Sequence, residues 1–230
     1  VTPVYYDEQG LETLKYLPFS STTTDGNFKY DAFSQQQGFY NTQLSGQGES
    51  WFYNKTDIEQ SPLNRPTKNY PAGNSWVGAG RGVATSYLNN TASEDVRIWN
   101  VNSNGTYTSS GAYGNGLLIK IITADENGKQ VIEYKDKEGK VILKKVQLDN
   151  NPGLNHDGWL CTYYLYDIYN NLRLVIQPKA ITTLKGNGWN ITSTIQDELC
   201  FRYEYDDKNR MSIKKVPGAA EVYMAYDKWD

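Results

Sequence analysis

The segment Tyr205-Asp206-Asp207-Lys208-Asn209-Arg210-Met211 predicts a tight reversal between two strands, and the expected fold class follows from it. The fourth position of a type I turn closed by a β-bulge needs a positive φ angle, which Gly accepts freely and Asn tolerates. An Asp at the first position can accept a hydrogen bond from the backbone N–H two residues later, which holds the turn closed. Asp206 and Asn209 occupy these positions, so we predict a β-hairpin.

The same spacing of Asp before Gly or Asn occurs five times. The five pairs are Asp7 with Gly10, Asp125 with Gly128, Asp136 with Gly139, Asp167 with Asn170, and Asp206 with Asn209. On both sides of the turns Tyr, Val, Ile and Leu alternate with Lys, Arg, Glu and Thr, which is the period of half-buried strands. A chain built from repeated hairpins is more typical of a scaffold or a binding surface than of an enzyme.

Hairpins follow one another from residue 117 onward. We expect strands over 117–123, 129–135, 140–148, 162–166, 172–177, 201–205 and 211–216. The turns at Asp125 and Asp136 begin 11 residues apart, a spacing typical of an antiparallel meander of short strands. Repeats of about 20 residues or more indicate units that bury their faces against one another. The predicted fold is therefore mainly β.

Residues 1–116 have a different character after the first hairpin, since they are rich in Gly, Ser, Thr, Asn and Gln. A short helix is expected over 31–44. Its predicted common face holds Phe33, Gln37, Tyr40 and Leu44. We divide the chain into an N-terminal region of long polar loops, 1–116, and a β-hairpin region, 117–230.

Within the N-terminal region, two further strands are expected over 83–88 and 96–101. They precede a Gly-rich turn region at 104–116.

Charge and hydropathy exclude several function classes. The formal net charge is −3 and the pI about 5.3, which gives no support to a nucleic-acid or anionic-membrane partner. No apolar run is long enough to insert into a membrane. Cys161 and Cys200 lie in aromatic, strand-like runs, so we expect two buried small hydrophobes, with a disulfide as the alternative.

No catalytic residue, cofactor or metal site is predicted, and we expect that the chain is not an enzyme. The one His, His156, lies in a polar loop, and no nucleophile motif accompanies it in the sequence. A metal site is not expected with a single His. The carboxylates of the five turns are better explained by turn closure than by acid–base chemistry.

Three Trp residues of the polar region suit a binding role. Trp51, Trp76 and Trp99 fall in irregular sequence, where loops commonly carry binding residues. Aromatic faces beside Asn, Gln and Asp suit the C–H faces and hydroxyl groups of a cell-surface glycan. The alternative is that these Trp residues anchor long loops onto the sheet, because large irregular segments need apolar contacts to order them.

The turns carry a family resemblance. The Tyr-Asp-x-x-Gly-Arg-Leu pattern of RHS or YD repeats is visible in residues 166–172 and 205–211, with looser copies at 6–11 and 134–140. Together with the stretches 61–65, 123–129, 197–206 and 214–219, they make the chain resemble RHS/YD-repeat proteins of the Bacteroidetes type. Asn stands where the family has Gly at 170 and 209, Lys replaces Arg at 140, and Asn replaces Arg at 171. Turn geometry survives these changes, since Asn tolerates a positive φ.

The resemblance implies a long strip of antiparallel β-hairpins that coils into a hollow shell. Such shells often enclose a C-terminal toxin or effector in secreted or surface-attached bacterial proteins, so the implied partners are adjacent repeats of the same chain and an effector cargo. Tyr226-Asp227-Lys228-Trp229-Asp230 starts another copy of the turn, and we expect the chain to be a piece of a longer protein. A structural segment of a shell is thus the first functional hypothesis, and a glycan-binding module the second.

Overall fold

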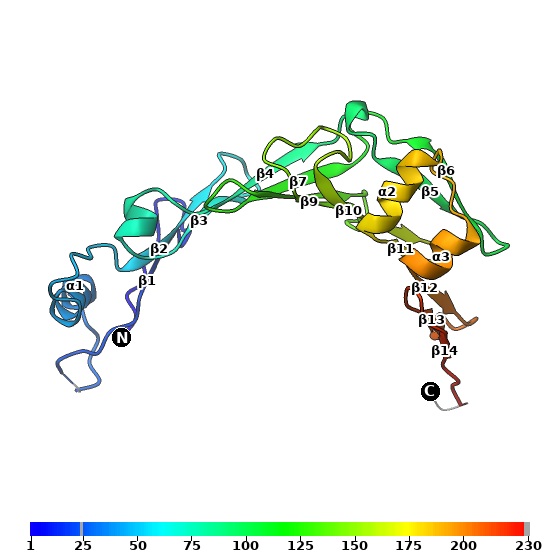
Figure 1. The fold of residues 1–230 in the computed structure, drawn as a ribbon. Helices are drawn as coiled ribbons and strands as arrows, with labels where there is room; N and C mark the ends of the chain where they lie inside the picture. The colour runs from blue at the N-terminus through cyan, green and yellow to red at the C-terminus, as the bar shows by residue number, and fades with distance from the viewer. Residues whose placement is uncertain (24, 228–230) are drawn as a thin grey trace. The chain divides into compact units, whose positions relative to one another are not determined.

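The computed structural model describes residues 1–23 and 25–227. The described chain is mainly β and its strand pairings are antiparallel, as predicted (Figure 1). It divides into two compact units. Unit 1 comprises Val1–Ser86 and Thr123–Lys129, and unit 2 comprises Tyr87–Ile122 and Gln130–Asp230. The boundary expected between residues 116 and 117 lies inside unit 2.

Unit 1 is a small antiparallel sheet with one α-helix. Its strands follow the order β1-β2-β3-β4. They are β1 (Leu14–Tyr16), β2 (Tyr53–Ile58), β3 (Pro66–Tyr70) and the first part of β4 (Val83–Asn89). A single π-helical turn, η1 (Asn74–Gly78), stands between β3 and β4. Strands β2 and β3 were not expected from the sequence, because their polar residues do not alternate with apolar ones.

The helix predicted over 31–44 is confirmed as α1 (Ala32–Gln43), flanked by Asp31 and Leu44. Its buried residue is Gln36, whereas Phe33 of the predicted face is 42% exposed. Gln36 is buried because its side chain supplies hydrogen bonds to two backbone carbonyl groups of unit 1. The side-chain amide of Gln36 donates to the carbonyl oxygens of Leu17 and Phe52, at 2.8 and 2.9 Å. A polar side chain therefore fixes this helix to the sheet.

Unit 2 holds the meander predicted from the Asp turns. Its strands follow the order β4-β7-β8-β9-β10-β11-β12-β13-β14, with β4 contributing its last residues. They are β7 (Ile119–Ala124), β8 (Gln130–Lys135), β9 (Val141–Gln147), β10 (Trp159–Tyr166), β11 (Leu172–Ile176), β12 (Cys200–Tyr205), β13 (Met211–Lys215) and β14 (Glu221–Tyr223). Each expected strand from 117 onward is present within a few residues.

A separate hairpin, β5 (Arg97–Val101) with β6 (Tyr107–Ala112), follows the 3₁₀ turn η2 (Ala92–Glu94). Strand β6 occupies the middle of the segment that we expected to be a Gly-rich turn region. Its residue Tyr107 is buried, which gives this polar strand an apolar anchor.

The core of unit 2 lies between the sheet and two helices that the sequence did not indicate. Helices α2 (Pro178–Gly186) and α3 (Ser193–Leu199) lie over β10 and β12 (Figure 1). Pro178 ends the preceding strand as expected, but it also begins α2, where its missing N–H and fixed φ are favourable. The core cluster holds the strand residues Tyr134, Leu143, Cys161, Tyr163, Leu174, Ile176 and Cys200 and the helix residues Ala180, Ile181, Leu184 and Ile195.

Two other features bear on the sequence predictions. None of the helices in the described part of the chain has the length and hydrophobicity needed to cross a membrane. The further turn expected at Asp227 extends to Asp230, and residues 228–230 lie outside the described residues.

Candidate functional site

All five Asp turns have the same backbone geometry. The fourth residue has a positive φ in each, and its N–H donates to the carbonyl oxygen of the Asp at 2.9–3.0 Å. The φ angles are 77° at Gly10, 80° at Gly128, 84° at Gly139, 69° at Asn170 and 58° at Asn209. The strand register shifts just before the turns at Asp136, Asp167 and Asp206, which is the bulge that closes such a turn. The sequence pattern thus corresponds to one repeated structural unit.

The Asp side chain closes each turn with more bonds than the sequence suggested. In four turns one carboxylate oxygen accepts the backbone N–H groups of both the second and the fourth following residues, at 2.8–3.0 Å. These are the turns of Asp7, Asp125, Asp167 and Asp206. At Asp136 the bond to the fourth following residue, Lys140, is 2.8 Å long. These carboxylates are engaged in holding the backbone.

Neighbouring turns of unit 2 are joined by side chains, and we call this row of bonds the turn ladder. Lys140 of the turn at Asp136 donates to the side-chain oxygen of Asn170. Asn171 of that second turn donates to the side-chain oxygen of Asn209 in the third, at 3.0 Å. Both Asn residues that stand at Gly positions of the repeat therefore use their side chains to bind the adjacent turn, which Gly could not do.

Charge pairs support the last two turns of the ladder. Arg210 donates to the second carboxylate oxygen of Asp206 at 2.8 Å, and this hydrogen bond lowers the pKa of Asp206. Arg173 approaches Asp167 at 3.4 Å in the same way. Both pairs are partly exposed, so they orient the turns more than they stabilise them.

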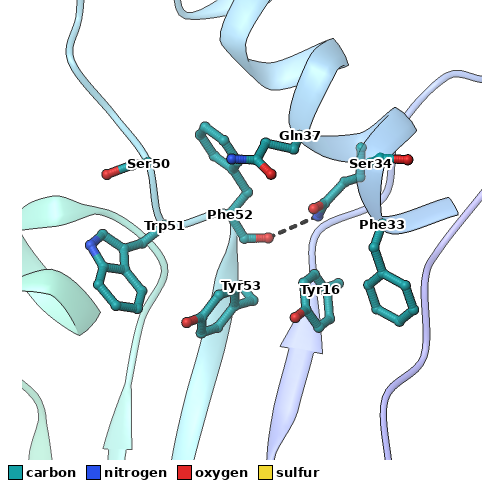
Figure 2. Close-up of a pocket in the computed structure, with 9 residues that line it drawn as sticks. Tyr16, Phe33, Ser34, Gln37, Ser50, Trp51, Phe52 and Tyr53 are labelled. Carbon is teal, nitrogen blue, oxygen red and sulfur yellow. Dashed lines mark hydrogen bonds between the residues drawn. The ribbon is translucent and has the colours of Figure 1, made fainter. Parts of the chain in front are cut away.

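The second candidate site is an aromatic pocket of about 440 Å³ in unit 1 (Figure 2). It is lined by Tyr16 from β1, by Phe33, Ser34, Gln36 and Gln37 from α1, and by Ser50, Trp51, Phe52 and Tyr53 at the start of β2. Strand pairing places Tyr16 directly opposite Tyr53. The amide of Gln36 draws α1 onto the sheet through the bond to Phe52 that Figure 2 marks with a dashed line. The pocket therefore depends on one helix and two strands meeting.

Four rings form a continuous row across the pocket, in the order Trp51, Tyr53, Tyr16 and Phe33 (Figure 2). Their centroids lie 5.6, 5.1 and 4.9 Å apart, and neighbouring ring planes meet at 72°, 47° and 74°. Edge-to-face contacts of this kind are favourable for aromatic pairs. Because neighbouring ring planes are tilted against one another, the row does not form one flat platform.

Trp51 is held by a close approach of backbone. A Cβ atom added at Gly78 would lie 2.7 Å from the indole nitrogen of Trp51, so only Gly leaves room for the ring at this point of η1. With one edge supported, Trp51 keeps 37% of its surface exposed.

Some polar groups of the pocket form no hydrogen bond with any described residue. The hydroxyls of Tyr16 and Tyr53 and the amide of Gln37 have no hydrogen-bond partner within residues 1–23 and 25–227. Burial raises the pKa of Tyr16 and of Tyr53, so both phenols stay protonated at neutral pH and can donate. In contrast, Ser34 and Ser50 already donate to Asp31 and Asn74.

The other two Trp residues proposed for binding do not line this pocket. Trp76 lies in η1 with the guanidinium of Arg81 over its ring at 5.0 Å. Trp99 lies in unit 2, where its ring packs edge-to-face against Tyr163 and Trp189 on the core cluster. These contacts agree with the alternative interpretation, in which a Trp anchors irregular chain. The agreement is better for Trp99, which packs on the core cluster, than for Trp51, which keeps 37% of its surface exposed.

His156 is buried in unit 2 and hydrogen-bonded to Tyr163. Tyr163 accepts a bond from the backbone N–H of Arg97 at 2.8 Å and lies 2.9 Å from Nε2 of His156. Burial lowers the pKa of His156 to about 3, so the ring is neutral. Within the described residues no three His, Cys, Asp or Glu side chains gather to hold a metal ion.

Of the residues that line the pocket, sequence reasoning proposed only Trp51 for binding. It placed Phe33 and Gln37 on the face of a helix and did not single out Tyr16 or Tyr53. The Tyr-rich composition was the available signal. It could not identify these residues, because they come from elements far apart in the chain and meet only through strand pairing and helix docking.

The aromatic pocket lies in the part of the chain that matches a known family model. Residues 1–89 match the model of a family described as a domain of unknown function (DUF6443). The matched segment contains all the residues of the aromatic pocket and strands β1 to β4. No curated protein matches the chain.

Proposed function

We propose that this chain is a non-catalytic structural segment of an RHS/YD-repeat shell in a secreted or surface-attached bacterial protein. The observation that carries the proposal is the turn ladder, in which three successive hairpins are joined at their tips by Lys140–Asn170 and Asn171–Asn209 bonds. Repeat architectures obtain their stability from contacts between nearest neighbours. Tip-to-tip bonds between hairpins with the same turn are contacts of that kind.

The use of the turn carboxylates supports a structural role. Each Asp that recurs in the pattern accepts backbone N–H groups of its own turn. Without the carboxylate, the partly buried N–H groups among them would lose their acceptor, which costs free energy. These bonds support the role of the repeated Asp residues in closing the turns.

The shell, its cargo and its location follow from the resemblance to RHS/YD repeats. The role proposed for the hairpins is to form part of a wall, with adjacent repeats of the same full-length chain as neighbours. The wall would enclose or present a C-terminal toxin or effector. No catalytic step is assigned to the residues of this segment.

Electron cryomicroscopy of the longest natural protein that contains this chain tests the proposal. We expect the hairpins of unit 2 to continue on at least one side into further hairpins of the same kind and to form the wall of an enclosed space. Hairpins that instead stand as an isolated globule, without neighbouring repeats, would contradict it.

A further inference from the structure

The aromatic pocket of unit 1 presents a surface with a definite chemistry. No side chain that lines it carries a charge at neutral pH. Its walls include the four rings of the row, and its unused polar groups are two phenols and one amide, on Tyr16, Tyr53 and Gln37. A charged ligand would lose its hydration here without gaining a counter-charge. A ligand that suits the pocket is therefore uncharged and largely apolar, and it carries a few hydrogen-bond acceptors for these donors.

We propose that this pocket binds a proline-rich peptide segment in the polyproline II conformation. A polyproline II helix has no internal hydrogen bonds, so its carbonyl groups are free to accept from phenol and amide donors. Aromatic-lined grooves are the usual partners of such segments, because the preformed helix loses little conformational entropy when it docks. The inference is independent of the structural role proposed for the hairpins of unit 2.

The dimensions of the ring row agree with this occupant. Steps of 5.6, 5.1 and 4.9 Å lead from Trp51 through Tyr53 and Tyr16 to Phe33. A polyproline II helix rises ~3.1 Å per residue, so about five residues cover the row. The ring planes are tilted against their neighbours by 47° to 74°, so the row offers ring edges as well as faces along its length.

A saccharide fits this pocket less well. Its hydroxyl groups point in many directions, and each one that is buried must find a donor or acceptor in place of water. The pocket offers few, because Ser34 and Ser50 are already bonded to Asp31 and Asn74. Its tilted rings also lack the flat platform on which a sugar ring would stack.

Calorimetric titration of the full 230-residue chain with decaproline tests the proposal. We expect saturable binding, and no binding of a Gly-Ser peptide of equal length, which has no preformed helix. Tyr53→Phe and Tyr16→Phe keep the rings and remove one donor each, so each should weaken binding by about threefold or more. Gln37→Ala should act in the same direction. Trp51→Ala should weaken binding more than tenfold.

Tyr30→Phe is the matched control, because Tyr30 also lies in unit 1 but outside the pocket and is 93% exposed. It should leave binding unchanged. Circular dichroism verifies the fold of each variant, and the two Tyr→Phe variants serve if Trp51→Ala does not fold. Three results would overturn the proposal: no decaproline binding at millimolar concentration, binding that the pocket variants do not change, or Trp51-dependent binding of oligosaccharides without binding of decaproline.

Discussion

Asn171 donates a side-chain hydrogen bond of 3.0 Å to Asn209, and this bond joins two hairpin turns that lie 38 residues apart in the chain. Asn209 has a φ of 58°, a conformation that Gly adopts at no cost. The Asn side chain at this position makes a hydrogen bond that Gly could not make, which offsets the backbone advantage of Gly. It connects one hairpin with the next.

The bond between Asn171 and Asn209 can be measured by a double-mutant cycle. Asn209→Gly relieves the strained φ but loses the bond, so its net effect on stability should be small. Asn209→Ala keeps the strain and loses the bond, and should destabilise by about 1–2 kcal/mol. Urea unfolding of these variants, alone and combined with Asn171→Ala, should show coupling of about 0.5–1 kcal/mol. Strict additivity would mean that the turns are not joined in solution.

Removal of a turn carboxylate should destabilise unit 2. Asp167 accepts the backbone N–H groups of Tyr169 and Asn171 at 3.0 and 2.9 Å. Asp167→Ala leaves both without their acceptor and should cost about 1–3 kcal/mol in urea unfolding. Asp167→Asn keeps a side-chain oxygen and is the matched control, with a smaller loss expected. Equal losses in the two variants would show that charge, and not turn closure, is what Asp167 supplies.

Gln36 and Gln37 form a natural pair of test positions in α1. Gln36 is buried and donates to the carbonyls of Leu17 and Phe52, whereas Gln37 is exposed. Gln36→Ala should destabilise unit 1 by about 1–3 kcal/mol, because the carbonyl oxygens of Leu17 and Phe52 each lose a donor in a buried or partly buried position. Gln37→Ala should change stability by less than about 0.5 kcal/mol. Thermal unfolding compares the two, and similar midpoints would refute the anchoring role of Gln36.

Stability should fall as pH is lowered from 7.5 to 5. Burial lowers the pKa of His156 to about 3 in the folded state, whereas the unfolded value is ~6.5. Between these values the unfolded chain binds a proton that the folded chain does not, so acid favours unfolding. The expected loss by pH 5 is about 2 kcal/mol. His156→Gln removes the titration, and its urea-unfolding free energy should vary less over this range. A variant as pH-sensitive as the natural chain would contradict the assignment.

The two cysteines should behave as protected thiols. Cys161 and Cys200 are free and buried, which agrees with the expectation of small hydrophobic core residues. Burial raises the pKa of Cys161 to about 11 and of Cys200 to about 12, so neither forms a reactive thiolate at neutral pH. A thiol reagent should label neither in the native chain and both in denaturant. Failure to label after denaturation without reductant would indicate a disulfide.

The turns could be predicted from the sequence because they depend on residues that are neighbours in the chain. Asp206 and Asn209 specify a reversal through one side-chain acceptor and one tolerated positive φ, and the flanking alternation specifies strands. The short helix from Ala32 could be predicted in the same way, but the residue that fixes it to the sheet, Gln36, could not. Gln36 is buried because of two carbonyls that belong to distant segments.

The positions of the reversals and the mainly β character could be predicted from the amino-acid sequence, because those properties depend on interactions over a few residues. Which turns are bonded to each other, and which rings share a pocket, is seen only in the folded chain. Asn171 meets Asn209, and Tyr16 meets Tyr53, through strand pairing that no local pattern specifies. Contacts between distant segments depend on register and docking, and these are settled by the burial and hydrogen bonding of the whole unit.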